Sequence, residues 1–263
     1  MDYQDIQLEL RDNVAVVTLN RPNEANALTL RMAQELHEAA LACDADPLVR
    51  AVVITGAGSK MFCAGGDLKG FLENADGLPS FMMRITSHLH RSISVFNRME
   101  APVIMAVNGT AAGGGFSFAM TGDLILAADT AKFTMAYTAA GLSPDGSSTH
   151  FLPRLIGVHR AKELMFTNRV LSAQEAMDWG LVNRVVPGAE LMETAMILAA
   201  DLAQGPTMAF GVVKALLLDS QNAPLDTQME YEARGMANIV RTQDAQEGIA
   251  AFVEKRKPNF VGG

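Results

Sequence analysis

The stretch APVIMAVNGTAAGGGFSFAMTG (residues 101–122) carries no charged side chain, and it decides the fold. Its length would suffice to span a bilayer. However, Asn108-Gly109 and the triplet Gly113-Gly114-Gly115 interrupt it, and such residues are typical of turns. The sequence therefore predicts a buried strand at 102–107, a glycine turn and a buried helix at 114–121, and no membrane span.

Segments on both sides of this stretch alternate between strand and helix patterns. Short β-like runs at 6–10 and 14–19 flank the polar turn Asp12-Asn13 and predict a hairpin. Two amphipathic patterns predict helices at 29–43 and 80–98. On the first of these helices, the apolar face is expected to carry Leu30, Ala33, Leu36, Ala40 and Leu41.

The alternation of strands and helices continues to about residue 186, and from residue 189 the pattern predicts helices only. Buried strands that alternate with helices imply a mostly parallel sheet covered by helices, which is an α/β fold. We therefore expect an α/β core over residues 1–190 and a helical C-terminal region over residues 191–263. The periodicity leaves open how the sheet is wound and whether the last helices pack on this chain or on a neighbour.

The composition excludes several classes of protein. Hydrophobic residues make up 49% of the 263 residues and charged residues 19%, which excludes a disordered chain. The 21 basic and 29 acidic residues give a net charge of −8. We expect no nucleic-acid partner, since proteins that bind nucleic acid are normally basic. The acidic N-terminus lacks the basic start and apolar stretch of a signal peptide, and this favours the cytoplasm.

No metal site is predicted. The two cysteines, Cys43 and Cys63, lack the spacing of a metal site and are too few for a disulfide framework. The five histidines form no pair with a third ligand nearby in the sequence. His37 and His159 are expected to be solvated helix residues.

Three further segments identify a family when they are taken together. They are Arg21-Pro22-x-x-Ala25-Asn26-Ala27-Leu28, then Phe62-Cys63-Ala64-Gly65-Gly66-Asp67-Leu68-Lys69, then Asn108-Gly109-x-Ala111-x-Gly113-Gly114-Gly115. In this order and at this spacing they resemble the enoyl-CoA hydratase/isomerase family, also called crotonases. Glu175-Ala176-x-x-Trp179-Gly180-Leu181-Val182 fits the family too. The resemblance implies a crotonase-like ββα spiral core, a C-terminal helical region used in trimerisation, and a homotrimer or a dimer of trimers.

The two glycine-rich loops imply an oxyanion hole. Each follows a buried strand and can present backbone N–H groups to one oxygen. A thioester that becomes an enolate places negative charge on its carbonyl oxygen, and preorganised N–H donors stabilise that charge. By resemblance the donors are the N–H groups of Gly66 and Gly114, and a helix that starts near Gly114 adds the positive end of its dipole. The alternative is that these glycines only permit tight turns.

The resemblance further implies that the acyl group arrives as a coenzyme A thioester. Coenzyme A is then part of the substrate, and no permanently bound cofactor is implied. In the family, segments near Ala25–Ala27 and Ala64–Leu68 line the coenzyme A site, and Lys69 is a candidate contact for phosphate or pantetheine. Lys255, Arg256 and Lys257 either meet the 3′-phosphate across a subunit contact or form a solvated helix end. The expected substrate-binding residues are Ala25, Ala27, Ala64, Asp67, Leu68, Lys69, Ser117 and Tyr137.

Two positions bear on the type of reaction. The family's hydratases use two glutamates, and the corresponding positions here hold Ser117 and Tyr137. Neither side chain can serve as a carboxylate acid or base, whereas hydration needs both water activation and protonation. The sequence therefore argues against ordinary 2-enoyl-CoA hydration, and Ser117 and Tyr137 are expected to line the acyl pocket.

Asp145 is the candidate base. The segment Gly141-Leu142-Ser143-Pro144-Asp145-Gly146 resembles the loop of the family's isomerase branches, including the 1,2-epoxyphenylacetyl-CoA isomerase type, in which an acidic residue faces the acyl chain. An isomerase can work with one base, which removes a proton from C2 and returns it at C4. The resemblance thus implies an isomerase with Asp145, Gly66 and Gly114 as catalytic residues, although Pro-Asp-Gly is also a common surface turn.

Three alternatives remain open. An aroyl-CoA dehalogenase-like hydrolase would use Asp145 as a nucleophile and a helical histidine, here His90, to activate water. That branch carries Trp where this chain has Tyr137 and a bulky aromatic residue where it has Gly66, which weakens the interpretation. The chain could also be an enoyl-CoA hydratase with atypical catalytic residues. Finally, it could be a silent CoA-binding scaffold, which would not need an acid at position 145.

Overall fold

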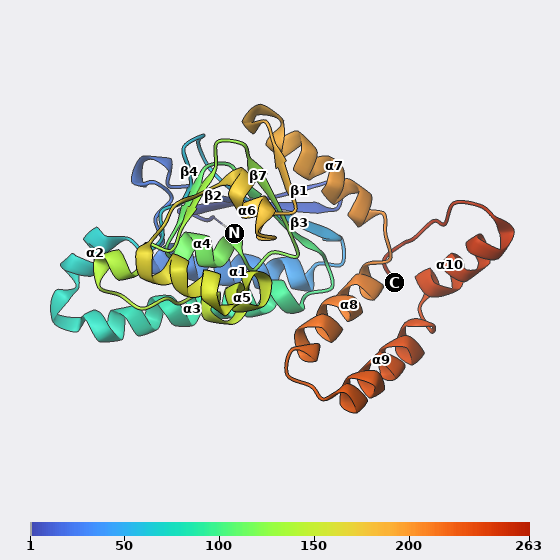
Figure 1. Ribbon diagram of the computed structural model, residues 1–263. Coiled ribbons are helices and arrows are strands. Elements are labelled where there is room, and N and C mark those ends of the chain that lie inside the picture. Colours follow the sequence, from blue (N-terminus) through green and yellow to red (C-terminus); the bar gives the residue numbers. More distant parts are fainter. Residues whose placement is uncertain (1) are drawn as a thin grey trace.

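A six-stranded sheet forms the centre of residues 2–263, the part of the chain that the computed structural model describes (Figure 1). Its first two strands pair antiparallel, and every other neighbouring pair is parallel. The hairpin turn places both Asp12 and Asn13 at positive φ, as a tight turn between two strands requires. In spatial order the strands are β1 (Ile6–Arg11), β2 (Val14–Leu19), β3 (Ala51–Gly56), β5 (Val103–Val107), β7 (Leu124–Ala128) and β10 (Arg184–Val186).

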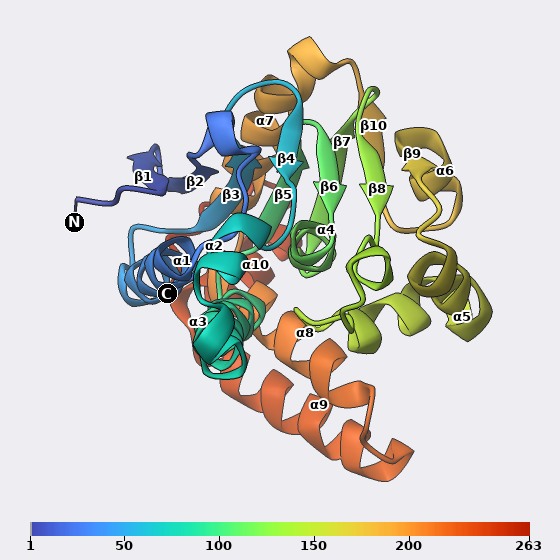
Figure 2. The ribbon, with the colours of Figure 1, turned by 90° about the vertical axis from the view of Figure 1, so that its left-hand side faces the viewer.

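A smaller four-stranded sheet lies beside the larger one (Figure 2). Its first three strands are parallel to one another, and the fourth is antiparallel to the third. In spatial order these strands are β4 (Met61–Cys63), β6 (Thr110–Ala112), β8 (Lys132–Thr134) and β9 (Leu171–Ser172).

The chain winds through the two sheets as a repeated unit. A long strand of the first sheet leads to a short strand of the second sheet and then to a helix, as in β3, β4 and α2, or β5, β6 and α4, or β7, β8 and α5. This confirms the expected ββα spiral. Because β4, β6 and β8 are parallel, their carboxyl ends meet at the same edge of the small sheet. Three loops are therefore brought together at that edge.

The helices follow the predicted pattern closely. Thr29 caps the first helix by accepting a hydrogen bond from the Met32 N–H, and Ser172 with Glu175 forms a capping box. The helix at 114 ends at residue 119, two residues earlier than predicted. The helices are α1 (Leu30–Ala45), α2 (Leu68–Glu73), α3 (Leu78–Arg98), α4 (Gly114–Ala119), α5 (Ser148–Thr167), α6 (Ala173–Asp178), α7 (Leu191–Ala203), α8 (Thr207–Ser220), α9 (Leu225–Ile239) and α10 (Gln243–Glu254).

One residue predicted on the buried face of α1 is exposed. Leu41 leaves 47% of its surface accessible, whereas Met32, Ala39 and Cys43 are buried. Leu41 lies five residues after Leu36, which turns it by about 140° around the helix relative to that buried residue. The prediction for Leu41 was therefore wrong, and the buried face is centred on its neighbours.

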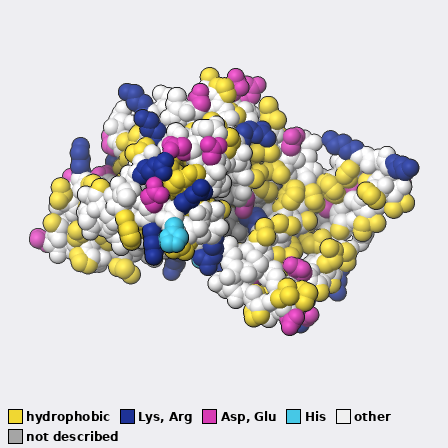
Figure 3. Space-filling model, viewed as in Figure 1, with side chains coloured by type: hydrophobic (Ala, Val, Ile, Leu, Met, Phe, Trp, Pro, Cys, Tyr) yellow, Lys and Arg dark blue, Asp and Glu magenta, His cyan; other side chains and the backbone are white. Residues whose placement is uncertain are grey.

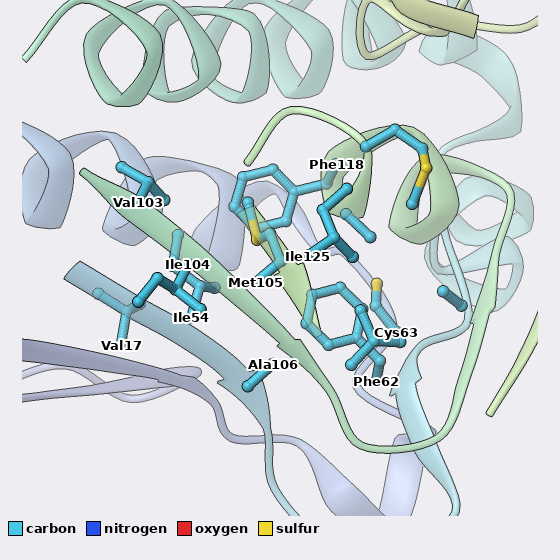
Figure 4. Packing of buried hydrophobic residues seen from close by; sticks show 14 of the residues in the cluster. Val17, Ile54, Phe62, Cys63, Val103, Ile104, Met105, Ala106, Phe118 and Ile125 are labelled. Carbon is cyan, nitrogen blue, oxygen red and sulfur yellow. The ribbon is translucent and has the colours of Figure 1, made fainter. Parts of the chain in front are cut away.

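The uncharged stretch 101–122 forms the middle of the core, as predicted. It folds into β5, β6 and α4, and Figure 4 shows Phe118, Met105 and Ile125 gathered together with Phe62 and Cys63 beside them. The packing there is so close that a Cβ added to Gly115 would lie 2.3 Å from the Cys63 carbonyl oxygen. Helix α4 can approach β4 only because residue 115 has no side chain.

Helices α8, α9 and α10 form an arm that extends from the body (Figure 1). A buried lysine fastens its base: Lys214 Nζ donates to the carbonyl oxygens of Phe96 and Ala101 and pairs with Asp123 Oδ2 at 2.7 Å. Helix α7, in contrast, packs on β3 and β5. The division at residue 190 stays a prediction.

Within residues 2–263, no single helix is both long and apolar enough to cross a membrane. Only the pair 188–203 and 207–220, bent by 103°, satisfies length and composition when taken together.

We predict that Gly115→Ala lowers the free energy of unfolding by about 1–3 kcal/mol, because the new methyl group overpacks the contact with Cys63. Urea unfolding followed by circular dichroism measures the change. Gly70→Ala is the control, since its Cβ would meet nothing closer than 3.8 Å. An equal loss in both variants would contradict the packing argument.

Candidate active site

The three loops that follow β4, β6 and β8 enclose a cavity of about 400 Å³ together with α3. Its walls are mostly apolar, and α3 contributes a row of residues at helical spacing. The cavity is lined by Leu28, Ala64, Gly65, Gly66, Leu68, Phe71, Pro79, Met82, Met83, Ile85, Thr86, Leu89, Gly113, Gly114, Ala136, Tyr137, Ala140, Leu142, Ser143 and Asp145.

The two glycine-rich loops touch each other in this cavity. A Cβ added to Gly65 would lie 2.8 Å from the Ala112 carbonyl oxygen and 3.0 Å from the Gly114 nitrogen, so only glycine allows this approach. The residue also has φ +91°, which favours glycine. The structure therefore brings Gly66 and Gly114, predicted from loops far apart in the sequence, to one site.

Backbone pairing holds the first loop beside the chain at Leu28. The Leu28 N–H donates to the Gly65 carbonyl at 2.7 Å, and the Asp67 N–H donates to the Leu28 carbonyl at 3.0 Å. This pairing uses the Gly65 carbonyl and the Asp67 N–H, which flank Gly66, and leaves the Gly66 N–H out of the ladder. Gly114 is the first residue of α4, and a helix gives its first N–H groups no internal partner. Both N–H groups can thus serve a ligand in the cavity.

Asp145 lies beside Gly114 and is held by a short chain of hydrogen bonds. A Cβ added to Gly114 would lie 3.9 Å from Asp145 Oδ1. The Tyr137 hydroxyl donates to Oδ1 at 2.5 Å, and it lies 2.8 Å from Ser117 Oγ. Since the single hydroxyl hydrogen of Tyr137 is used on Asp145, the Ser117 hydroxyl donates to Tyr137. Asp145 Oδ2 remains outside this chain.

Burial and the Asp145 carboxylate raise the pKa of Tyr137 well above its ordinary value of 10.0. Desolvation is the largest cause, because the phenolate would be taken out of water. The negative charge of Asp145 and the hydrogen bond donated to it act in the same direction. Tyr137 therefore keeps its proton and acts as a hydrogen-bond donor to the carboxylate.

Ser117 does not line the cavity, contrary to expectation. It leaves only 1% of its surface accessible and lies behind Tyr137. The loop after Asp145 covers it: a Cβ added to Gly146 would lie 2.8 Å from Ser117 Cβ. Ser117 thus supports Tyr137 from behind, whereas Tyr137 lines the cavity as predicted.

A second cleft, of about 790 Å³, shares the lining residues Gly66 and Leu68 with the first cavity and is the candidate coenzyme A site. Predicted residues that line this second cleft are Ala25, Ala27, Asp67, Leu68 and Lys69. Ala64 lines the first cavity and not the second, although its N–H donates to the Ala25 carbonyl at 3.0 Å.

The Asp67 carboxylate is largely committed to the fold. Its Oδ1 accepts from the N–H groups of Lys69 and Gly70 and caps α2, and its Oδ2 lies 3.3 Å from Arg21 Nη1. Lys69 is exposed on the rim of the cleft.

The basic C-terminal cluster lies at the end of α10, on the arm and away from α2 (Figure 1). Arg256 forms ion pairs with Glu247 and Glu254. Its charge is therefore partly neutralised within its own helix end. Within this chain the cluster does not line the candidate coenzyme A cleft.

Two kinds of site residue were missed from the sequence. Phe71 packs against the loop that carries Gly66. A Cβ added to Gly66 would lie only 2.5 Å from the Phe71 ring. Met82, Met83 and Thr86 of α3 form the outer cavity wall. The amphipathic spacing of α3 could have indicated that a second face meets a cavity, but it does not say which cavity. Among residues 2–263, no group of three or more His, Cys, Asp or Glu side chains could hold a metal ion.

Known proteins resemble this chain in sequence and in fold. Residues 9–263 match the family described as enoyl-CoA hydratase/isomerase. The 1,2-epoxyphenylacetyl-CoA isomerase of Escherichia coli strain K12 is 37% identical over 250 residues, which cover 95% of each chain. The crotonyl-CoA hydratase of Syntrophomonas wolfei is 37% identical over 262 residues and 99% of each chain. The solved enoyl-CoA hydratase of Bacillus anthracis superimposes with a TM-score of 0.92 at 35% identity, over 99% of this chain and 100% of that one.

We predict that Tyr137→Phe removes part of the alkaline destabilisation of the protein. Because the folded state raises the pKa of Tyr137, its stabilising contribution is complete below the unfolded value of 10.0 and is lost as pH rises above it. The wild type should lose up to about 1.4 kcal/mol per pH unit relative to the variant above pH 10. Urea unfolding at pH 8 and pH 10.5 measures this. Tyr231→Phe, at an exposed site, is the control, and parallel curves for wild type and Tyr137→Phe would refute the prediction.

Proposed function

Since the chain belongs to the enoyl-CoA hydratase/isomerase family, we propose that it isomerises the acyl group of a coenzyme A thioester through an enolate. Asp145 is the acid and base, and the N–H groups of Gly66 and Gly114 are the oxyanion donors. The family assignment supports an acyl-CoA enzyme, and the arrangement of this cavity supports the isomerase.

One observation carries the proposal: the apolar cavity contains a single usable base. Of the residues that line it, only Asp145 and Tyr137 ionise, and the raised pKa of Tyr137 keeps its proton in place. The Tyr137 hydroxyl donates to Asp145 Oδ1 and makes no hydrogen bond to Oδ2. A lone carboxylate beside the oxyanion donors suits the removal and return of one proton.

The proposed reaction has two steps. Asp145 Oδ2 takes a proton from C2 of a 3-enoyl thioester, and the C2–H electrons form a dienolate whose negative oxygen accepts hydrogen bonds from Gly66 and Gly114. Preorganised donors of this kind contribute roughly 3–4 kcal/mol each in other enzymes. The carboxyl group then delivers the same proton to C4, and the double bond moves into conjugation with the thioester. Atoms and charge balance without a further reactant.

Hydration would need a second acid or base, but the side chains at positions 117 and 137 form hydrogen bonds that orient Asp145 instead. Ser117 and Tyr137 stand where the family's hydratases carry glutamates, and both are engaged in holding Asp145. The names of the relatives include a hydratase as well as an isomerase. The hydrogen-bond chain to Asp145 favours the isomerase.

The remaining alternatives receive less support from the geometry. A dehalogenase-like hydrolase needs His90 free to activate water, but His90 Nε2 accepts a hydrogen bond from the Gly146 N–H at 3.2 Å. A silent scaffold has no need of Asp145, yet the hydroxyl groups of Tyr137 and Ser148 and a backbone turn hold this residue in the cavity.

We propose that coenzyme A lies in the second cleft and that no metal or redox cofactor takes part. The segments at Ala25 and Ala27 line this cleft, and Lys69 on its rim offers a charge to a phosphate. The thioester end would pass Gly66 into the acyl cavity, since Gly66 lines both cavities.

We further propose that the arm mediates assembly as a homotrimer or a dimer of trimers. Large hydrophobic side chains are exposed along it, and Figure 3 shows them gathered over α8, α9 and α10. Exposed patches of this extent are typical of protein interfaces. Among these residues are Val213, Leu217, Leu225, Met236, Ile249, Phe252 and Val253.

We predict that Asp145→Asn lowers kcat for 3-enoyl-CoA isomerisation by roughly 10²- to 10⁴-fold, because the amide still accepts the Tyr137 hydrogen bond but cannot take a proton. The growth of conjugated enoyl thioester absorbance measures the rate. Exchange of the C2 hydrogen into deuterium oxide gives a second readout of enolate formation. Gln174→Asn, on the distant helix α6, is the control. Wild-type protein that neither forms conjugated product nor exchanges C2 hydrogen would refute the isomerase.

The assembly proposal predicts that Phe252→Glu dissociates the oligomer. Phe252 leaves 86% of its surface accessible in the single chain. A carboxylate at this position would make it costly to bury the same surface in an interface between subunits. Sedimentation velocity should give three or six times the 28.1 kDa chain mass for wild type, and less for the variant. Leu48→Glu introduces the same change off the arm. A monomeric wild type would contradict the proposal.

A further inference from the structure

His90 contacts the turn that carries Asp145. It lies on α3 with half of its side chain exposed, and its Nε2 accepts a hydrogen bond from the Gly146 N–H at 3.2 Å. The same nitrogen lies 3.9 Å from Asp145 Oδ2. A nitrogen that accepts a hydrogen bond carries no proton, so the geometry requires the neutral imidazole with its hydrogen on Nδ1. The imidazole therefore does not form an ion pair with Asp145 in this arrangement.

The hydrogen bond completes the support of one peptide group. The Asp145 carbonyl accepts from the N–H of Ser148 at 3.2 Å and from Ser148 Oγ at 2.9 Å. The N–H of the same peptide group belongs to Gly146 and is held by His90. This peptide is thus fixed at both ends, which fixes the direction of the Asp145 side chain.

The turn needs this support because its backbone is unusual. Gly146 has φ +59° and Ser147 has φ +64°, so two consecutive residues adopt the left-handed region, which a residue with a side chain rarely does. The close contact between Gly146 and Ser117 leaves no room for the turn to relax in that direction. A small rotation of the peptide would move the carboxylate away from the oxyanion donors.

We propose that neutral His90 is a positioning residue: by accepting the Gly146 N–H, it holds the peptide that aims Asp145 at C2 of the substrate. The inference rests on the proposed function, in which Asp145 is the base. A displacement of about 1 Å of a reacting group can cost on the order of 10²-fold in rate. His90 acts through Asp145 and touches no reacting atom.

Protonation of His90 reverses the effect. Nε2 then becomes a donor and cannot accept from Gly146, and the nearest acceptor is Asp145 Oδ2. The peptide is released, and the oxygen that should take the substrate proton is bound by the imidazolium. The ionisable groups facing the ring from the neighbouring segments are Asp145 and, behind it, Tyr137. Arg91, the next residue on α3, acts on His37, whose pKa is lowered by burial first and then by the charges of His88 and Arg91.

Two substitutions test the role of the acceptor. His90→Gln places an oxygen where Nε2 stood, so it can accept from Gly146 but cannot be protonated. His90→Leu has no acceptor. We expect kcat at pH 8 within about threefold of wild type for His90→Gln and roughly 10- to 100-fold lower for His90→Leu, with KM unchanged within about twofold. His159→Gln, on the exposed surface of α5, is the control.

The pH profile separates positioning from simple structural support. In wild type kcat should fall on the acid side, because an Nε2 that carries a proton cannot accept from the Gly146 N–H. In His90→Gln this acid limb should move to lower pH. An unchanged acid limb, or full activity in His90→Leu, would overturn the inference. If His90→Gln were as inactive as His90→Leu, the imidazole would act chemically and the inference would also be wrong.

A direct readout does not depend on activity. Nitrogen-15 spectra of labelled histidines at pH 7.5, with His90 assigned by its loss in His90→Gln, should show Nε2 unprotonated and Nδ1 protonated. A proton on Nε2 would overturn the inference even in an active enzyme. If wild type shows this tautomer but isomerises no 3-enoyl thioester, the proposed function fails while the His90–Gly146 contact stands.

Discussion

The parallel pairing of β4, β6 and β8 is the constraint on which the candidate site depends. Their carboxyl ends meet at one edge of the small sheet, and this edge brings Gly66, Gly114 and Tyr137 together from loops distant in sequence. The pairing is possible only at close range, since a Cβ on Gly65 would strike the Ala112 carbonyl and a Cβ on Gly115 would strike Cys63. Gly65 and Gly115 thus allow the close approach. Their neighbours Gly66 and Gly114 line the cavity and carry the N–H groups proposed as donors.

The second feature is the chain of hydrogen bonds that runs from Ser117 through Tyr137 to Asp145. Ser117 is buried and supports Tyr137, and Tyr137 donates to one carboxylate oxygen. Low polarity strengthens these bonds and keeps the tyrosine protonated, so Tyr137 orients the Asp145 carboxylate as a hydrogen-bond donor. Ser148 and His90 hold the backbone of the same residue from the other side. The proposed base is therefore a carboxylate that several neighbouring groups hold in place.

Much of this could be predicted from the sequence, but unequally. The alternation of elements and the hairpin at Asp12-Asn13 follow from local patterns, and they were confirmed. Leu41 was assigned to the wrong face because periodicity gives a stripe and not its edges. Ser117 was expected in the cavity wall, but the turn at Gly146 covers it. Phe71 and the outer wall of α3 were missed, since no local pattern tells which helix faces a cavity.

The sequence by itself determined the α/β class, because buried runs and turn residues act through local backbone physics. Its motifs also carried the resemblance to the enoyl-CoA hydratase/isomerase family, which implied the candidate residues Asp145, Gly66 and Gly114. Only the tertiary structure decided which groups meet: that Tyr137 donates to Asp145, that Ser117 lies behind it, and that His90 accepts from Gly146. These contacts join residues on separate elements, and their geometry depends on how the sheets and helices pack, which spacing along a chain does not record.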